Sequence, residues 1–222
     1  MKGLIIINFK NYLEISGSKS LQLSRIAEEV TKEYDISIFI APPNPSLSQV
    51  CNSVKIPVIC QHLDNAEVGA STGFFIPEIA KSFGSHGSLL NHSEHRIDTS
   101  YVEDLIRRLK KLDMTSIVCA RTPNEAGSFA KFDPEYIAIE PPELIGSGKS
   151  VSMEDPDIIM RSLKEVQRNS SYSNLICGAG ITTKEDVQKA VELGSEGILI
   201  ASGLIKSTSW KDKLIELVEG FF

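Results

Sequence analysis

Three residues that could carry out proton transfer each stand just after a short apolar run of the sequence. They are Lys10, His92 and Glu140. Taken singly, Lys10 suits a solvated loop and His92 a structural histidine, whereas a carboxylate that closes an apolar run, as Glu140 does, is costly unless it has a partner or a task. Glycine-rich turns at 178–180 and 201–203 follow two further runs, and glycine also serves simple tight turns. A cation, an imidazole, a carboxylate and two such turns suit proton transfer on a small phosphorylated carbonyl compound.

The apolar runs are the predicted strands. Most of them are apolar on both faces, which is typical of parallel strands buried on both sides. We expect eight strands, at 4–8, 36–40, 57–61, 88–91, 116–119, 136–140, 175–177 and 197–200. Segments of helical period lie between them, with start signals at Asn44-Pro45, Asp155-Pro156, Ser100…Glu103, Thr122…Glu125 and Thr182…Glu185.

Eight strand-then-helix units over this length predict an α/β fold, a single (β/α)8 barrel with eight parallel strands. We expect residues 1–222 to form one catalytic domain, because no linker or low-complexity tract interrupts the alternation. An open, doubly wound sheet has the same periodicity and stays an alternative. In a closed barrel the carboxyl ends of the strands meet at one rim, which would bring Lys10, His92 and Glu140 together.

The composition narrows the partners and the location. A net charge of −6 argues against a nucleic-acid or anionic-membrane binder, which needs a basic surface. No apolar stretch approaches the roughly 20 residues of a membrane span. None of the four cysteines shows C-x-x-C spacing, so we expect reduced, buried thiols and a cytoplasmic location. His62, His86 and His95 have no metal-ligand spacing, and we expect neither a metal nor a cofactor.

Five motifs at the predicted strand ends resemble those of the triosephosphate isomerase family, and the resemblance extends along essentially the whole chain. In order, they are Asn8-Phe9-Lys10, Asn91-His92-Ser93-Glu94, the segment 138–149 (AIEPPELIGSGK), Cys177-Gly178-Ala179-Gly180 and Ala201-Ser202-Gly203. The compact length and the sequence PPELIG are similar to the short, archaeal-type branch of that family. The fold implied is the TIM barrel.

The resemblance implies an aldose–ketose isomerase that interconverts dihydroxyacetone phosphate and D-glyceraldehyde 3-phosphate through an enediolate. Glu140 would be the base. His92, held neutral by a helix N-terminus, would polarise the carbonyl and relay protons. Lys10 would stabilise the negative charge, with Asn8 and Phe9 beside it in the substrate site, and Glu94 would pair with Lys10 and orient it.

The resemblance also implies how the phosphate is bound. The donors would be backbone N–H groups of a lid at about 142–150 and of two glycine-rich turns, and closure of the lid would exclude water. The residues assigned to this role are Ile145, Gly146, Ser147, Gly180, Ala201 and Ser202.

Three positions depart from the longer enzymes of the family, and one segment bears on assembly. Asn91 stands where the longer enzymes usually have glycine, and Glu143 and Leu144 stand where their lid carries a tryptophan. The segment 68–73 is similar to a loop that family members insert into a neighbouring subunit, so we expect a homo-oligomer, a dimer or a tetramer, with Thr72 near the partner's Asn8 and Lys10.

Two other functions compete with isomerisation. A phosphate-binding barrel aldolase would use a Schiff-base lysine, commonly from the sixth strand, but that strand ends in Glu140. A non-catalytic barrel acting as a binding module would be expected to lose at least one of Lys10, His92 and Glu140, and all three are present.

Overall fold

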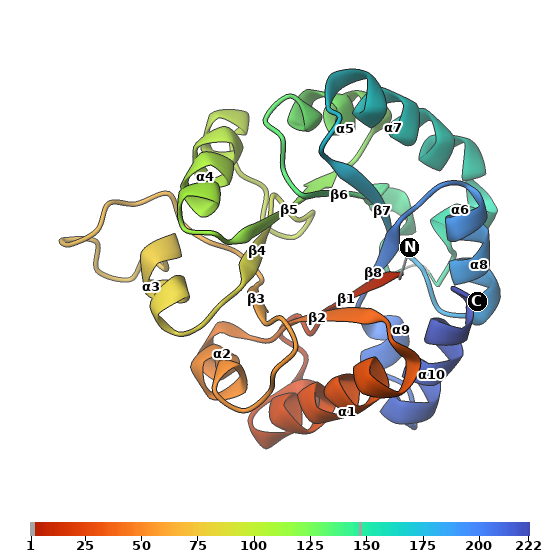
Figure 1. Ribbon diagram of the computed structural model, residues 1–222, viewed down its shortest axis with the longest axis horizontal. Helices are drawn as coiled ribbons and strands as arrows, with labels where there is room; N and C mark the ends of the chain where they lie inside the picture. The colour runs from red at the N-terminus through yellow and green to blue at the C-terminus, as the bar shows by residue number, and fades with distance from the viewer. Residues whose placement is uncertain (1–2, 147) are drawn as a thin grey trace.

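Eight parallel strands form one barrel in the computed structural model, which describes residues 3–146 and 148–222. The strands run in the order β2-β1-β8-β7-β6-β5-β4-β3, and a parallel bridge between Ile40 and Val58 joins the two ends of this order (Figure 1). Their bounds are β1 Leu4–Asn8, β2 Ser37–Ala41, β3 Ile59–Cys60, β4 Gly87–Leu90, β5 Thr115–Ala120, β6 Tyr136–Ile139, β7 Asn174–Gly178 and β8 Gly197–Ile200. The predicted barrel is therefore confirmed, and the open sheet is excluded.

Alternation along the strands divides the core into two layers. In β1, Ile6 belongs to a cluster that fills the barrel, whereas Ile5 and Ile7 belong to a larger cluster shared with the surrounding helices. Successive side chains of a strand point to opposite faces, so strands buried on both sides have to be apolar throughout. The same alternation decides which residues at the strand ends face the barrel axis.

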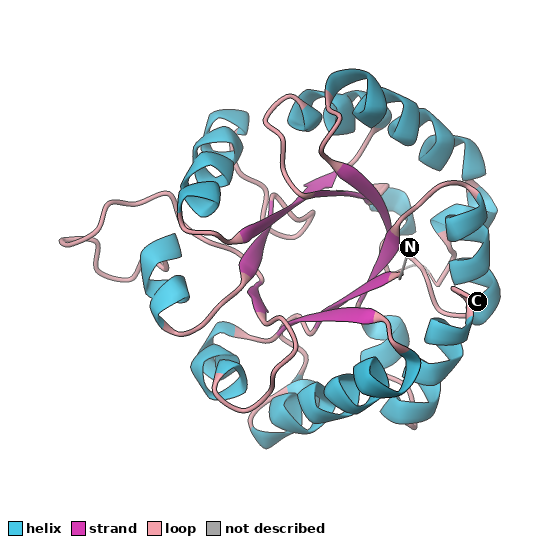
Figure 2. Ribbon diagram, viewed as in Figure 1, coloured by secondary structure: helices cyan, strands magenta, loops and turns pink. Residues whose placement is uncertain are grey.

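A ring of helices surrounds the barrel (Figure 2). The helices are α1 Ser18–Tyr34, α2 Asn44–Cys51, α3 Pro77–Ser82, α4 Thr99–Lys111, α5 Pro123–Ala130, α6 Val151–Glu154, α7 Pro156–Asn169, α8 Lys184–Glu192, α9 Ser202–Ile205 and α10 Trp210–Glu219, with 3₁₀ turns at Leu13–Ile15 and Pro142–Leu144. No helix in the described ranges is long and apolar enough to cross a bilayer.

Two of the five predicted helix starts are confirmed. Asp155 caps α7, where its Oδ1 accepts a hydrogen bond from the N–H of Ile158 at 3.2 Å, and the Thr122 hydroxyl caps α5 in the same way. The other three assignments were wrong. Helix α4 begins at Thr99 after Asp98, α2 begins at Asn44 itself, and the capping box of α8 lies one residue further along, at Thr183 and Asp186.

The segment between β3 and α3 reaches away from the barrel and forms the extension at the left of Figure 1. It contains Thr72, which is exposed, and two large apolar side chains that are also exposed, Val68 and Phe74. Since exposed apolar groups are common singly but less so together, this extension is a candidate contact surface.

Candidate active site

A pocket lies at the carboxyl ends of the strands, where the sequence predicts the site. It encloses about 510 Å³, including solvent at its mouth. The predicted site residues that line it are Asn8, Lys10, His92, Glu140, Ile145, Gly146, Gly180, Ala201 and Ser202. They come from the ends of β1, β4, β6, β7 and β8, which meet because the barrel is closed.

Glu140 and His92 face each other across this pocket. Oε1 of Glu140 lies 3.6 Å from Nε2 of His92, and the two side chains are only 6% and 8% exposed. Oε2 of Glu140 is buried and accepts no hydrogen bond from any residue in the described part of the chain. A buried carboxylate oxygen without a donor is costly, which indicates that substrate or water completes this site.

The residues on the two strands beside Glu140 are small and leave space for its side chain. Glu140 continues the inward face of β6 after Ala138, and Gly178 on the adjacent strand has no side chain that would collide with it. Cys119 lies on the other adjacent strand, where it pairs with Ala138, two residues before Glu140. Burial, followed by the charge of Glu140, raises the pKa of Cys119 well above its ordinary value, so the sulfur stays protonated.

The imidazole of His92 is oriented by the main chain. Its Nδ1 accepts a hydrogen bond from the N–H of Glu94 at 3.2 Å. An imidazole that accepts at Nδ1 carries its proton on Nε2, which is the atom on the side of Glu140. The expected helix N-terminus is not what supplies this donor. Residues 93–95 form a turn and bend, and helix α4 begins only at Thr99.

Lys10 is held on three sides. Its Nζ contacts Glu94 Oε1 at 2.7 Å, its N–H donates to Asn8 Oδ1 at 2.9 Å, and its carbonyl accepts from Gln61 Nε2 at 3.0 Å. The backbone at Lys10 has a φ of 49°, a conformation that costs free energy for a residue with a Cβ. The strained turn and its partners place a largely buried ammonium group at the pocket.

The lid and the β7 turn lie against each other at the pocket. Gly180 has a φ of 73°, and a Cβ there would fall 1.8 Å from the carbonyl oxygen of Lys149. Gly146 and Gly148 line the pocket and also have positive φ values. Glycine is therefore required at position 180 both for the conformation and for the close approach. Ser147, assigned to the phosphate site, lies outside the described residues.

The comparisons with known proteins agree with this geometry. The family model described as "Triosephosphate isomerase" matches residues 3–219. The chain belongs to the triosephosphate isomerase family. It is 40% identical to the triosephosphate isomerase of Methanothermobacter thermautotrophicus, covering 97% of this chain and 94% of that one. It is 41% identical to that of Methanothermus fervidus, with 98% of both covered, and 44% identical to that of Cenarchaeum symbiosum, with 97% and 96% covered.

One residue that the triosephosphate isomerase motifs assign to the site lies elsewhere. Phe9 is fully buried in the outer core with Ile5 and Ile7, and it does not line the pocket. The reason is the alternation of the strand, which turns Asn8 inward and Phe9 outward. Thr72 is exposed in the extension after β3, and its placement near the active site of a neighbouring subunit stays a prediction.

A second groove of about 1530 Å³ adjoins the pocket and shares Lys10 and His92 with it. The rings of His62 and His95 stack along it with centroids 3.7 Å apart. Burial is the largest cause that lowers the pKa of His62. His95 lowers this pKa further, whereas Asp64 raises it. Sequence reasoning assigned no role to these histidines, because their stacking depends on tertiary structure.

The described residues contain no group of three or more histidine, cysteine, aspartate or glutamate side chains that could hold a metal ion.

Sequence reasoning also missed three neighbours of the predicted catalytic groups. Gln61 holds the Lys10 turn, Cys119 lies on the strand beside Glu140, and Gly178 leaves space for the Glu140 side chain. Of these, only Gly178 left a signal, since it lies in the Cys-Gly-Ala-Gly motif.

Proposed function

The chain is an isomerase of the triosephosphate isomerase family, and we propose that it interconverts dihydroxyacetone phosphate and D-glyceraldehyde 3-phosphate with Glu140 as the base. The observation that carries this assignment is the 3.6 Å approach of Glu140 and His92 in a pocket that also contains Lys10. A buried carboxylate with one free oxygen and an imidazole with its proton on Nε2 are the two groups that proton transfer next to a carbonyl requires.

The reaction then proceeds in two stages, formation of an enediolate and its conversion to the aldehyde. Glu140 removes a proton from the hydroxymethyl carbon of the ketone, and Nε2–H of His92 hydrogen-bonds to the carbonyl oxygen, where negative charge develops. The ammonium group of Lys10 stabilises the enediolate. Glu140 returns the proton to the neighbouring carbon while His92 moves a proton between the two oxygens, and the aldehyde is formed. No atom is gained or lost.

The phosphate end of the substrate would lie against Gly180, Ala201 and Ser202. These residues line the pocket, and backbone N–H groups of such glycine-containing turns can approach an anion closely. The lid residues Ile145 and Gly146 would add donors when they close over it. This division leaves the reacting carbons beside Glu140 and His92.

A coupled assay of triose phosphate interconversion, with purified protein and no added metal, tests the proposal. We expect turnover in both directions. Absence of isomerisation by folded protein would contradict it. Trapping of a covalent adduct with borohydride and a carbonyl substrate would favour the aldolase instead, although the lysine that lines the described part of the pocket, Lys10, is paired with Glu94.

We further propose that the enzyme assembles as a homo-oligomer and works in the cytoplasm. Val68 and Phe74 on the extension and Leu13 after β1 are exposed by 65%, 58% and 85%, and the groove beside Lys10 could receive the extension of a second copy. The four cysteines are free thiols, as expected in a reducing compartment. Light scattering at micromolar concentration tests the assembly, and a fully active monomer would contradict it.

A further inference from the structure

Asn91 occupies the position between strand β4 and His92, and its backbone is in the left-handed region with a φ of 59°. The side chain is almost completely buried. Glycine adopts this conformation at no steric cost, and asparagine is among the residues with a side chain that tolerate it best. A buried asparagine at this position therefore costs more conformational free energy than glycine would, and its contacts indicate what it contributes.

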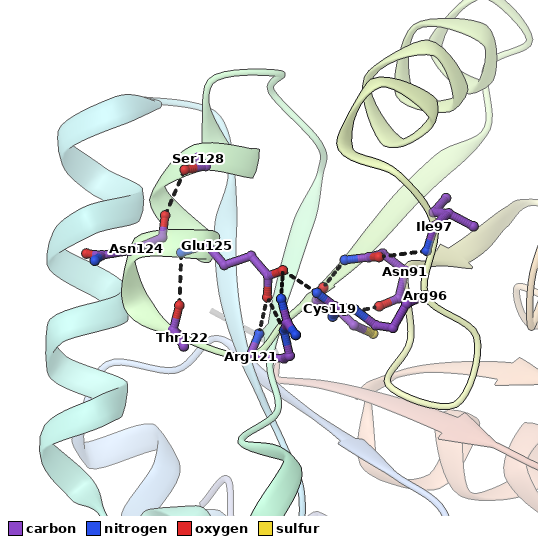
Figure 3. Close-up of polar contacts among 9 residues, drawn as sticks. All are labelled: Asn91, Arg96, Ile97, Cys119, Arg121, Thr122, Asn124, Glu125 and Ser128. Carbon is purple, nitrogen blue, oxygen red and sulfur yellow. Dashed lines mark hydrogen bonds and ion pairs between the residues drawn. The ribbon is translucent and has the colours of Figure 1, made fainter.

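Both ends of the Asn91 amide are hydrogen-bonded (Figure 3). Nδ2 donates to the carbonyl oxygen of Cys119 at 3.1 Å, and Oδ1 accepts from the N–H of Ile97, also at 3.1 Å. The first bond ties the end of β4 to the end of β5. The second closes the loop 92–97, which carries His92 and Glu94.

Strand β5 continues this connection to Glu140. The carbonyl oxygen of Ala120, the residue after Cys119, accepts a hydrogen bond from the N–H of Glu140 at 2.8 Å. The end of β5 thus holds Asn91 on one side and Glu140 on the other. A shift of Asn91 relative to β5 would change the separation of His92 and Glu140, the two groups that must act on neighbouring atoms of one substrate.

A charged network supports Asn91 from outside the barrel. Nη1 of Arg96 donates to the carbonyl oxygen of Asn91 at 3.1 Å, and its Nη2 pairs with Glu125 at the start of α5. Glu125 also accepts from the N–H of Arg121 at 2.6 Å, and Thr122 caps the same helix (Figure 3). The network therefore anchors the loop 92–97 to the N-terminus of α5.

We propose that Asn91 is a positioning residue, whose side-chain amide sets the placement of His92 relative to Glu140 by binding the β4 end to the β5 end. The inference rests on the proposed function. It differs from a role in backbone conformation alone, since glycine would supply the same φ and neither side-chain bond.

Asn91→Gly separates these two roles. Because a misplacement of about 1 Å can cost on the order of 10²-fold in rate, we expect kcat to fall by at least about 10-fold while KM stays within about twofold. The matched control is Asp113→Gly, which relieves a similar φ of 51° at an exposed position after α4. Its kinetics should not change. Both variants are assayed well below their melting temperatures, so that lost stability alone does not lower kcat.

A kcat for folded Asn91→Gly within twofold of the wild-type value, or a rise in KM at unchanged kcat, would overturn the inference. If Asn91→Gly does not fold, Asn91→Asp decides, because it keeps the Oδ1 acceptor for the N–H of Ile97 and loses the Nδ2 donor to the carbonyl oxygen of Cys119. It too should lower kcat and spare KM, and an unchanged kcat would be the contradicting result. An inactive wild type would instead refute the proposed function, on which this inference depends.

Discussion

The Cγ atom of Glu140 lies where a side chain on Gly178 would be, since a Cβ at position 178 would fall 2.5 Å from it. Ordinary contacts between such carbon atoms are about 1 Å longer. The Glu140 side chain, which directly follows β6, therefore requires glycine at position 178, whereas the backbone there does not, because Gly178 is not among the residues with positive φ.

Gly178→Ala should consequently act on catalysis. We expect kcat to fall by on the order of 10²-fold, because the added methyl group displaces Glu140 by about 1 Å, and we expect a small change in KM. Steady-state kinetics measure this. Gly127→Ala on α5 is the control, since it adds the same methyl group far from the pocket. Equal kinetics for the two variants would mean that Glu140 does not need its present position.

His92→Gln keeps a hydrogen-bond donor but removes the proton relay. We expect kcat to fall by on the order of 10²-fold or more, in line with general acid–base contributions, and affinity to change far less. His86→Gln, at the opposite end of β4, should have no kinetic effect, because His86 is exposed and remote from the pocket. Near wild-type turnover of the His92 variant would show that another group polarises the carbonyl.

The lid should become protected when an anion binds. A Cβ at Gly146 or Gly148 would meet nothing within 4 Å, so the segment around them is loosely packed. Closure would form backbone contacts to the phosphate, and such loops open on the microsecond-to-millisecond scale. Hydrogen exchange at the amides of 143–146 and 148–150 should slow with saturating phosphate-bearing inhibitor, while exchange in α1 stays the same. Identical lid exchange in both states would argue against gating.

Buried thiols should make the fold less stable in alkali. Burial raises the pKa of Cys51 from 9.0 to about 11 and that of Cys60 to about 12. Thiols of the unfolded chain release protons near pH 9, whereas the buried thiols of the folded chain do not. The stabilising contribution of the buried thiols is therefore complete below pH 9 and is lost as the pH rises toward their folded-state pKa values. The free energy of unfolding should fall by up to about 1.4 kcal/mol per thiol and pH unit.

Urea unfolding at pH 8, 9 and 10 measures this slope. Cys51→Ala removes one half-buried thiol and should make the slope shallower. A free energy of unfolding that rises between pH 9 and 10 would contradict the assigned direction.

Sequence reasoning located the strands to within one or two residues in most cases, because a strand buried on both sides requires a continuous apolar run. It placed Glu140 and His92 at one rim because the carboxyl ends of the strands of a closed barrel meet there. It failed where the deciding contact is tertiary. The bond from Asn91 to Cys119 joins two strands, and the stacking of His62 on His95 joins two loops.

Two other failures were local. Thr182 and Thr183 are adjacent, and each is followed three residues later by an acidic side chain, so the capping box could not be assigned by spacing alone. Phe9 was assigned to the site because it lies within the motif, although strand alternation turns it into the outer core. That alternation could have been applied at the sequence level.

Glu140→Asp addresses the central claim most directly. The substitution keeps the charge and withdraws the carboxylate by about 1 Å, which should cost on the order of 10²-fold in proton abstraction and leave affinity almost unchanged. Glu135→Asp, just before the start of β6, is the matched control, since Glu135 contacts Ser116 and Tyr172 and lies away from the pocket. The decisive measurement is the exchange of the substrate's C–H proton with deuterated solvent. We predict that the Glu140 variant exchanges at least about 10²-fold more slowly than the wild type, whereas exchange at the wild-type rate would show that Glu140 is not the base.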